Sequence, residues 1–179
     1  MRIFVSYRRS DVGGHAGRLS DALGQRLGAK NVFQDVAAIA PGQDSRPLVS
    51  AALDRCDVAL AVIGPSWLTA STPGGRPRLL EPDDYVRLDL ATVLQRDLPE
   101  IPVLVGGASL LAAAELPEDL RPLSRRQAIV LHDATWRQDV ENLVRSLLGE
   151  SVATPERSHR RTSIVVGAVA LAAVVGLVF

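Results

Sequence analysis

Three polar loops carry the side chains in this sequence that are best suited to bind a ligand, and each follows a short apolar run with the composition of a buried strand. They contain Ser6, Tyr7, Arg8 and Arg9 in the first, Asp35 at the start of the second, and Trp67 in the third. Arginine has a planar fork that matches phosphate or carboxylate groups, and the rings of Trp67 and Tyr85 could stack on a flat ring. The alternatives are that the arginines are solvated and that Trp67 only covers the end of the sheet.

Several enzyme signatures are missing. The sequence has no G-x-x-x-x-G-K-[ST], no G-x-G-x-x-G after the first strand, and no G-x-S-x-G. These absences exclude a P-loop NTPase, a Rossmann dehydrogenase and a nucleophile-elbow hydrolase. A response-regulator receiver needs an acidic pair after strand one, an aspartate ending strand three and a lysine after strand five. Those places hold Tyr7-Arg8, Ile63-Gly64 and His132-Asp133, so that class is excluded too.

Charge and cysteine content restrict the partners. The 179 residues include twenty basic and twenty acidic side chains and have a formal net charge of zero, so no overall basic field favours nucleic acid. The lone Cys56 cannot form an intrachain disulfide, which fits a reducing compartment. His15, His132 and His159 are too scattered to indicate a metal site. We therefore expect no metal and no nucleic-acid partner.

The elements that must position these side chains alternate along the chain. Apolar runs rich in Val, Ile or Phe predict strands at 2–6, 31–34, 58–63, 101–105 and 128–131, and periodic apolar residues predict helices at 16–27, 46–53, 84–96 and 136–148. Two prolines within 109–123 predict a short helix and an irregular connection there. Alternating strands and helices indicate an α/β fold with a doubly wound parallel sheet. In such sheets the ligand crevice lies beyond the carboxyl ends of the strands, where the three loops would meet.

The last part of the chain has a different composition. Residues 1–150 form the predicted globular domain, the polar stretch 151–163 is a predicted linker, and the apolar stretch 164–179 is a predicted transmembrane helix. Arg157, Arg160 and Arg161 precede the apolar stretch, and the positive-inside rule places that side in the cytoplasm. The start, Met1-Arg2 followed directly by a strand, is not typical of a signal peptide. We expect a single-pass membrane protein with a cytoplasmic domain; the alternative is a buried helix of a soluble domain.

The order and spacing of several segments resemble bacterial TIR (Toll/interleukin-1 receptor) domains. The segments are IFVSYRR from Ile3, VFQD from Val32, PGQ from Pro41, CDVALAVIG from Cys56 and WL from Trp67. The resemblance covers roughly residues 1–148. It implies the TIR fold, a flavodoxin-like doubly wound sheet of five parallel strands, which agrees with the strands predicted from the apolar runs.

The resemblance also implies partners and an activity. TIR domains associate with one another through the loop after the second strand, which here spans about 36–44 and includes Ile39, Pro41, Gly42 and Asp44. Many TIR domains cleave NAD+ between nicotinamide and ribose, in defence or cell-death signalling, and release ADP-ribose or a cyclic isomer. NAD+ would then be a substrate, and no cofactor is needed. In this interpretation Arg8 or Arg9 holds the pyrophosphate, and Tyr85 or Trp67 stacks on a ring.

One position departs from the family pattern. The catalytic glutamate of active relatives lies four residues beyond an aromatic on the helix after strand three, and here those positions hold Tyr85 and Asp89. A spacing of four places both side chains on one helical face. Asp89 keeps the charge but is one methylene shorter, and it could instead pair with Arg87 or Arg96. Two functions therefore stay open: an NAD+ glycohydrolase with Asp89 facing the ribose, and a TIR–TIR scaffold without chemistry.

Overall fold

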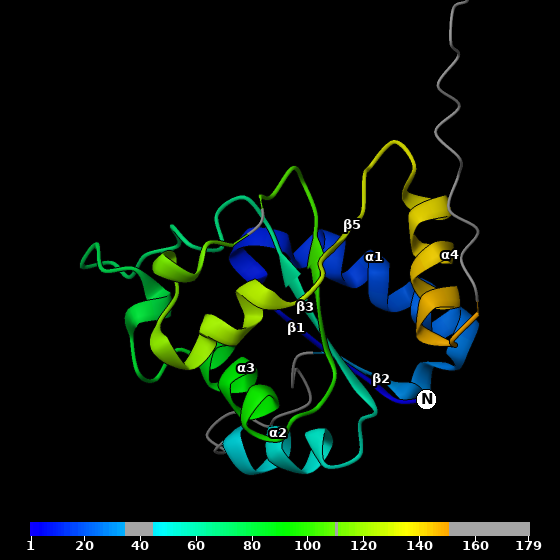
Figure 1. The fold of residues 1–179 in the computed structure, drawn as a ribbon, viewed down its shortest axis with the longest axis horizontal. Helices are drawn as coiled ribbons and strands as arrows, with labels where there is room; N and C mark the ends of the chain where they lie inside the picture. Colours follow the sequence, from blue (N-terminus) through cyan, green and yellow to red (C-terminus); the bar gives the residue numbers. More distant parts are fainter. Residues whose placement is uncertain (35–44, 110, 151–179) are drawn as a thin grey trace, which may run out of the picture.

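The chain folds around one parallel sheet (Figure 1). The computed structural model describes residues 1–34, 45–109 and 111–150. The five strands, in the spatial order β2-β1-β3-β4-β5, are β1 (Ile3–Tyr7), β2 (Val32–Gln34), β3 (Val58–Ile63), β4 (Glu100–Leu104) and β5 (Ile129–Val130). All four strand pairings are parallel. This confirms the predicted TIR-like α/β architecture with five parallel strands.

The central strands are buried on both faces, which explains their continuous apolar sequence. Every residue of β3 is buried, and the strand pairs with β1 in a register that runs from Ile3 opposite Val58 to Tyr7 opposite Val62. Alternate β3 residues enter different clusters: Leu60 packs in the cluster under one face, and Ala61 packs under the other. The carboxyl ends of β1 and β3 therefore lie side by side.

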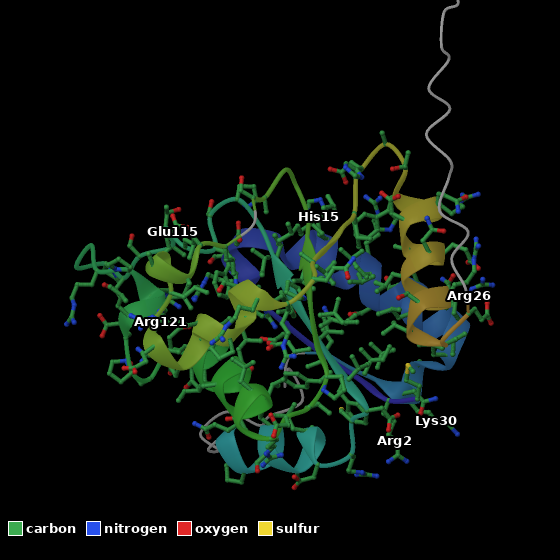
Figure 2. All side chains as sticks on the ribbon, viewed as in Figure 1. Arg2, His15, Arg26, Lys30, Glu115 and Arg121 are labelled. Atoms are coloured by element: carbon green, nitrogen blue, oxygen red, sulfur yellow. The ribbon has the colours of Figure 1, made fainter. Side chains whose placement is uncertain are left out.

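Helices cover both faces of the sheet (Figure 1). The helical segments are α1 (Arg9–Leu27), η1 (Ala29–Asn31), α2 (Ser45–Leu53), η2 (Arg78–Leu80), α3 (Tyr85–Gln95), η3 (Ala113–Glu115), η4 (Glu118–Arg125) and α4 (Trp136–Leu147). Residues of α1 and α4 share one cluster with the sheet, whereas α2, α3 and η4 contribute to the clusters on the other face. Arg26 of α1 lies beside α4 (Figure 2), and it forms an ion pair with Glu141 of that helix.

One predicted boundary needs correction. Helix α1 begins at Arg9 and not at residue 16, because the first turn is joined to the rest of the helix across a kink at Val12, whose φ/ψ of −132°/24° is not helical. Gly13 and Gly14 follow the kink, and glycine is a poor helix former, so the sequence gives no helical signal there. Between 109 and 123 the predicted short helix and irregular connection correspond to two 3-10 segments, one of which contains Pro122.

Several predictions for the chain lie outside the described residues. They are Asp35, the interaction-loop residues Ile39, Pro41, Gly42 and Asp44, the linker 151–163 and the apolar segment 164–179. Within the described part, no helix is both long and apolar enough to cross a membrane.

Candidate functional site

A cleft of about 830 Å³ lies at the carboxyl end of β1. Its lining residues come from the end of β1, the start of α1, the segment between β3 and α3, and the first turns of α3: Tyr7, Arg8, Arg9, Ser10, Ser71, Thr72, Pro73, Arg78, Asp84, Tyr85, Val86 and Asp89. Strand β1 connects to β2 on one side, and the chain then returns to β3 on the other side. This is a topological switch point, the place where open α/β sheets bind ligands.

The cleft brings together the polar groups predicted from the first loop and from the helix after β3. Tyr7, Arg8 and Arg9 come from one segment, and Tyr85 and Asp89 come from another more than seventy positions along the chain. Tyr85 begins α3 and is 68% exposed, so its ring is available to a ligand, and Asp89 lies one turn further along the helix. The arrangement can hold a ligand between a cationic segment and a helix that carries an aromatic ring and a carboxylate.

Arg8 has a different role from the one predicted. Its guanidinium donates two hydrogen bonds of 2.9 Å to the two carboxylate oxygens of Asp84, and Arg8 is only 3% exposed. Asp84 also caps α3 by accepting a hydrogen bond from the backbone N–H of Arg87. Because Asp84 occupies its fork, Arg8 joins β1 to the start of α3 and does not offer that fork to a phosphate.

Two further predicted ligand contacts are buried in the described structure. Trp67 is 1% exposed and packs in the cluster with Leu79 and Leu90, so it cannot stack on a ligand and instead covers the end of the sheet. Ser6 is buried in β1, and its hydroxyl has no hydrogen-bond partner among the described residues. Neither side chain lines the cleft.

Comparison with known proteins is consistent with this arrangement. A family model described as "TIR domain" matches residues 3–148. The chain belongs to the TIR domain family. The match spans all five strands and the four α-helices of the described structure.

One of the similar solved structures shows the same fold. The TIR domains of the activated Roq1 resistosome, which directly recognises the pathogen effector XopQ, align with a TM-score of 0.61 and 12% identity, over 82% of this chain and 98% of theirs. A TIR-STING receptor from C. gigas aligns with a TM-score of 0.49 and 22% identity, over 78% of this chain and 38% of its own. The CMP N-glycosidase BcmB of Clostridium botulinum aligns with a TM-score of 0.46 and 14% identity, over 80% of this chain and 98% of its own. At these identities the first likeness shows the fold alone, and a comparison with curated protein sequences finds no significant match.

The arginines near Asp89 in this TIR domain have other partners. Arg87 donates from Nε to Asp119 at 2.9 Å and from a terminal nitrogen to the carbonyls of Leu79 and Leu80. Arg96 pairs with Asp54 at 2.7 Å. Both arginines therefore hold α3 against neighbouring segments. Asp89 lines the cleft and, like Arg9, has an interaction with another group.

One wall of the TIR cleft is a turn that the sequence analysis did not predict. Residues 70–78, which we call the cleft hairpin, turn back on themselves: Ser71 and Pro77 form an antiparallel bridge, and the N–H of Gly75 donates to the carbonyl of Thr72 at 2.9 Å. The φ of Gly75 is +78°, a conformation that glycine adopts without strain. The signal that could have indicated this turn is the run Thr72-Pro73-Gly74-Gly75, since Pro and Gly favour tight turns.

Proposed function

We propose that this TIR domain cleaves NAD+ at the bond between nicotinamide and ribose. The observation that carries the proposal is the convergence of Arg9, Tyr85 and Asp89 on one cleft at the switch point of the sheet. A dinucleotide has an anionic centre and flat rings at both ends, which match a cation and an exposed aromatic. The cleft volume, about 830 Å³, lies in the range of small-molecule sites.

The chemistry assigned to Asp89 is electrostatic. As the C–N bond breaks, its electron pair leaves with nicotinamide, and positive charge develops on the ribose ring. A carboxylate beside the ribose stabilises that charge and can accept hydrogen bonds from the ribose hydroxyls. Water then adds to the sugar carbon and releases one proton, which gives nicotinamide and ADP-ribose. If a ring nitrogen of the adenine adds instead and one proton is released, the product is a cyclic ADP-ribose, which contains one water molecule less than ADP-ribose.

The length of Asp89 sets the expected rate. Its carboxylate is one methylene closer to the backbone than that of the family's glutamate, and a displacement of about 1 Å can cost on the order of a hundredfold in rate. We therefore expect slow turnover by the native chain and faster turnover by Asp89→Glu. The longer side chain carries the carboxylate further from the α3 backbone, at a position that lines the cleft together with Tyr85.

An NAD+-cleavage assay on the clustered full chain tests the proposal. Asp89→Ala and Asp89→Asn should lower kcat at least about a hundredfold, because each removes the charge beside the developing cation. Asp83→Asn is the matched control, since Asp83 is exposed and does not line the cleft. Turnover that survives Asp89→Ala would remove Asp89 from the mechanism, and absence of turnover in every form would overturn the enzymatic function.

We further propose that the domain self-associates through the loop at 36–44 and that association promotes activity. The second candidate function, a scaffold that recruits TIR domains without chemistry, is favoured by the substitution of aspartate for the family's glutamate. Changes at Pro41 and Gly42 separate the two candidates. If the domain is an enzyme, these changes abolish both association and NAD+ turnover. If it is a scaffold, they abolish association, and changes at Asp89 have no effect. Light scattering measures association, and the NAD+ assay measures turnover.

A membrane anchor is the third part of the proposal. The apolar composition of 164–179 and the arginines at 157, 160 and 161 support a single transmembrane helix with the TIR domain in the cytoplasm. Anchoring would raise the effective concentration of TIR domains and favour their association. Retention of the full chain on lipid vesicles after an alkaline wash supports the anchor, and complete release contradicts it.

A further inference from the structure

The three arginines that line the cleft differ in whether their side chains already have interaction partners. Arg8 is buried in its bidentate pair with Asp84. Arg9 also has an interaction with another group. The side chain of Arg78 lines the cleft, is exposed, and makes no hydrogen bond or ion pair with any residue of 1–34, 45–109 or 111–150. Of the three arginines that line the cleft, Arg78 is therefore the one whose guanidinium has no partner in the described part of the chain, so all of its N–H donors are available to a ligand.

The backbone that carries Arg78 is fixed on both sides. Its N–H donates to the carbonyl of Ala70 at 2.8 Å, which closes the cleft hairpin. The next residue, Leu79, is 2% exposed and packs against the core cluster that contains Trp67. A side chain that starts from a fixed backbone loses less conformational freedom when it binds a ligand than one on a free loop.

Hydroxyl groups accompany the cation. Ser71 and Thr72 line the same cleft from the opposite arm and the turn of the hairpin, whereas the acidic residues of the cleft, Asp84 and Asp89, come from α3 and its cap. The neighbouring Arg76 is different, because its Nε pairs with Glu81 at 3.2 Å and it does not line the cleft. One free planar cation beside two hydroxyls is a donor set for phosphate oxygens.

We propose that Arg78, with the hydroxyls of Ser71 and Thr72, binds the diphosphate of the substrate, and that the cleft hairpin thereby selects dinucleotides over phosphate-free nicotinamide nucleosides. The inference rests on the proposed function for its substrate. The α3 side of the cleft, with Tyr85 and Asp89, faces the reacting ribose, and the hairpin faces the anionic centre. Arg78 determines affinity and specificity and does not contact the bond that breaks.

Steady-state kinetics of the full chain test this role. Arg78→Ala should raise KM for NAD+ at least about tenfold with most of the loss of kcat/KM in KM, since one charge-assisted contact is lost. With nicotinamide riboside, which has no phosphate, the same change should leave kcat/KM within about twofold. Arg76→Ala is the matched control and should leave both substrates unaffected. An unchanged KM for NAD+ in Arg78→Ala, or an equal loss with both substrates, would overturn the inference.

A binding measurement separates this inference from the proposed function. Calorimetry of the full chain should show that ADP binds about tenfold or more weakly to Arg78→Ala than to the native chain, whereas adenosine binds equally to both. Arg78→Lys should recover part of the ADP affinity, because lysine keeps the charge and loses the fork. Arg78-dependent ADP binding without any NAD+ cleavage would support the subsite and reject the glycohydrolase. Equal ADP affinity of native and Arg78→Ala, or no ADP binding at all, would reject the subsite.

Discussion

The pair formed by Arg8 and Asp84 joins two segments that are far apart in sequence. Arg8 follows β1 directly, Asp84 caps α3, and both side chains are almost completely buried. Such a pair adds little over an apolar pair of equal size, but loss of one partner leaves an uncompensated charge in a medium that solvates it poorly. The role of this pair in the TIR domain is therefore to hold the start of α3, the helix that carries Tyr85 and Asp89, against the end of β1.

We expect Arg8→Ala to lower the free energy of unfolding by about 3–5 kcal/mol, because the carboxylate of Asp84 is left buried without its partner. Asp84→Asn keeps a capping side chain while it removes the charge, so it isolates the electrostatic part of the loss. Denaturant unfolding of the two single variants and the double variant gives the coupling energy. The double variant should lose much less than the sum of the singles.

Asp83→Asn is the control for this cycle, since Asp83 is exposed and adjacent in sequence. A cost below about 1 kcal/mol for Arg8→Ala would show that the ion pair behaves as an exposed one. Additive losses in the double variant would likewise contradict a direct coupling between the two side chains.

At the scale of elements, the end of β3 lies against the start of α1. The carboxylate of Asp11 accepts a hydrogen bond from the N–H of Ser66 at 3.0 Å, which ties the first turn of α1 to the segment after β3. A Cβ at Gly64 would lie 2.2 Å from Cγ1 of Val12 and 2.6 Å from an oxygen of Asp11. Glycine is therefore required there by the close approach of the two elements.

Gly64→Ala should destabilise the domain by about 1–3 kcal/mol, because the side chains of Val12 and Asp11 must move to admit the methyl group. Val12→Ala in the same chain should recover part of that loss by removing the nearest clashing atom. Thermal unfolding followed by circular dichroism measures both effects. Gly14→Ala is the control: nothing lies within 4 Å of a Cβ there, so it should be neutral or slightly stabilising in the helix. Equal melting temperatures for Gly64→Ala and the native chain would refute the steric requirement.

Strand β4 begins with a buried carboxyl group. Glu100 is 5% exposed, and neither carboxyl oxygen has a hydrogen-bond partner among the described residues. Burial raises the pKa of Glu100 from its ordinary 4.5 to about 7, against the opposing effect of the Arg126 charge. Between these two values the folded chain keeps the proton and the unfolded chain releases it.

The stability of the domain should therefore fall as pH rises from about 4.5 to about 7, by on the order of 3 kcal/mol from this group. Glu100→Gln carries no titrating proton, so its stability should lack this loss and exceed that of the native chain at pH 8. Urea unfolding at pH 5 and pH 8 measures the difference. Glu118→Gln, at an exposed position, should leave the pH dependence of the native chain unchanged. A native-like pH slope in Glu100→Gln would contradict the assignment.

The elements that sequence predicts well are those whose signal is local. Strands β1 and β3 were predicted within a residue or two because a run of buried Val, Ile and Leu is itself the strand signal. The start of α1 was missed because its first turn is held by contacts with the segment after β3 and not by helical periodicity. The sequence predicts ligand contacts for Arg8 and Trp67, whereas Arg8 pairs with Asp84 and Trp67 packs in an apolar cluster. A single sequence does not show which distant carboxylate or apolar cluster a side chain will contact.

The apolar core joins segments from both ends of the family match. The three apolar clusters draw on residues from Ile3 to Leu147, and together they cover both faces of the sheet. The family match ends at residue 148, close to the end of α4. All described members of these clusters lie before residue 148, and the division of the chain into domain, linker and anchor stays a prediction.

A chain that ends after Glu150 should therefore keep the melting temperature of the native domain within about 2 °C, since it loses no contact of the described core. The same truncation should abolish retention on lipid vesicles and lower NAD+ turnover at equal bulk concentration, because a tether raises the local concentration of associating domains. Artificial dimerisation of the truncated chain should restore turnover without restoring vesicle binding. A truncated chain that melts several degrees lower would assign part of the core to the tail, and one that stays on vesicles would place membrane attachment within the domain itself.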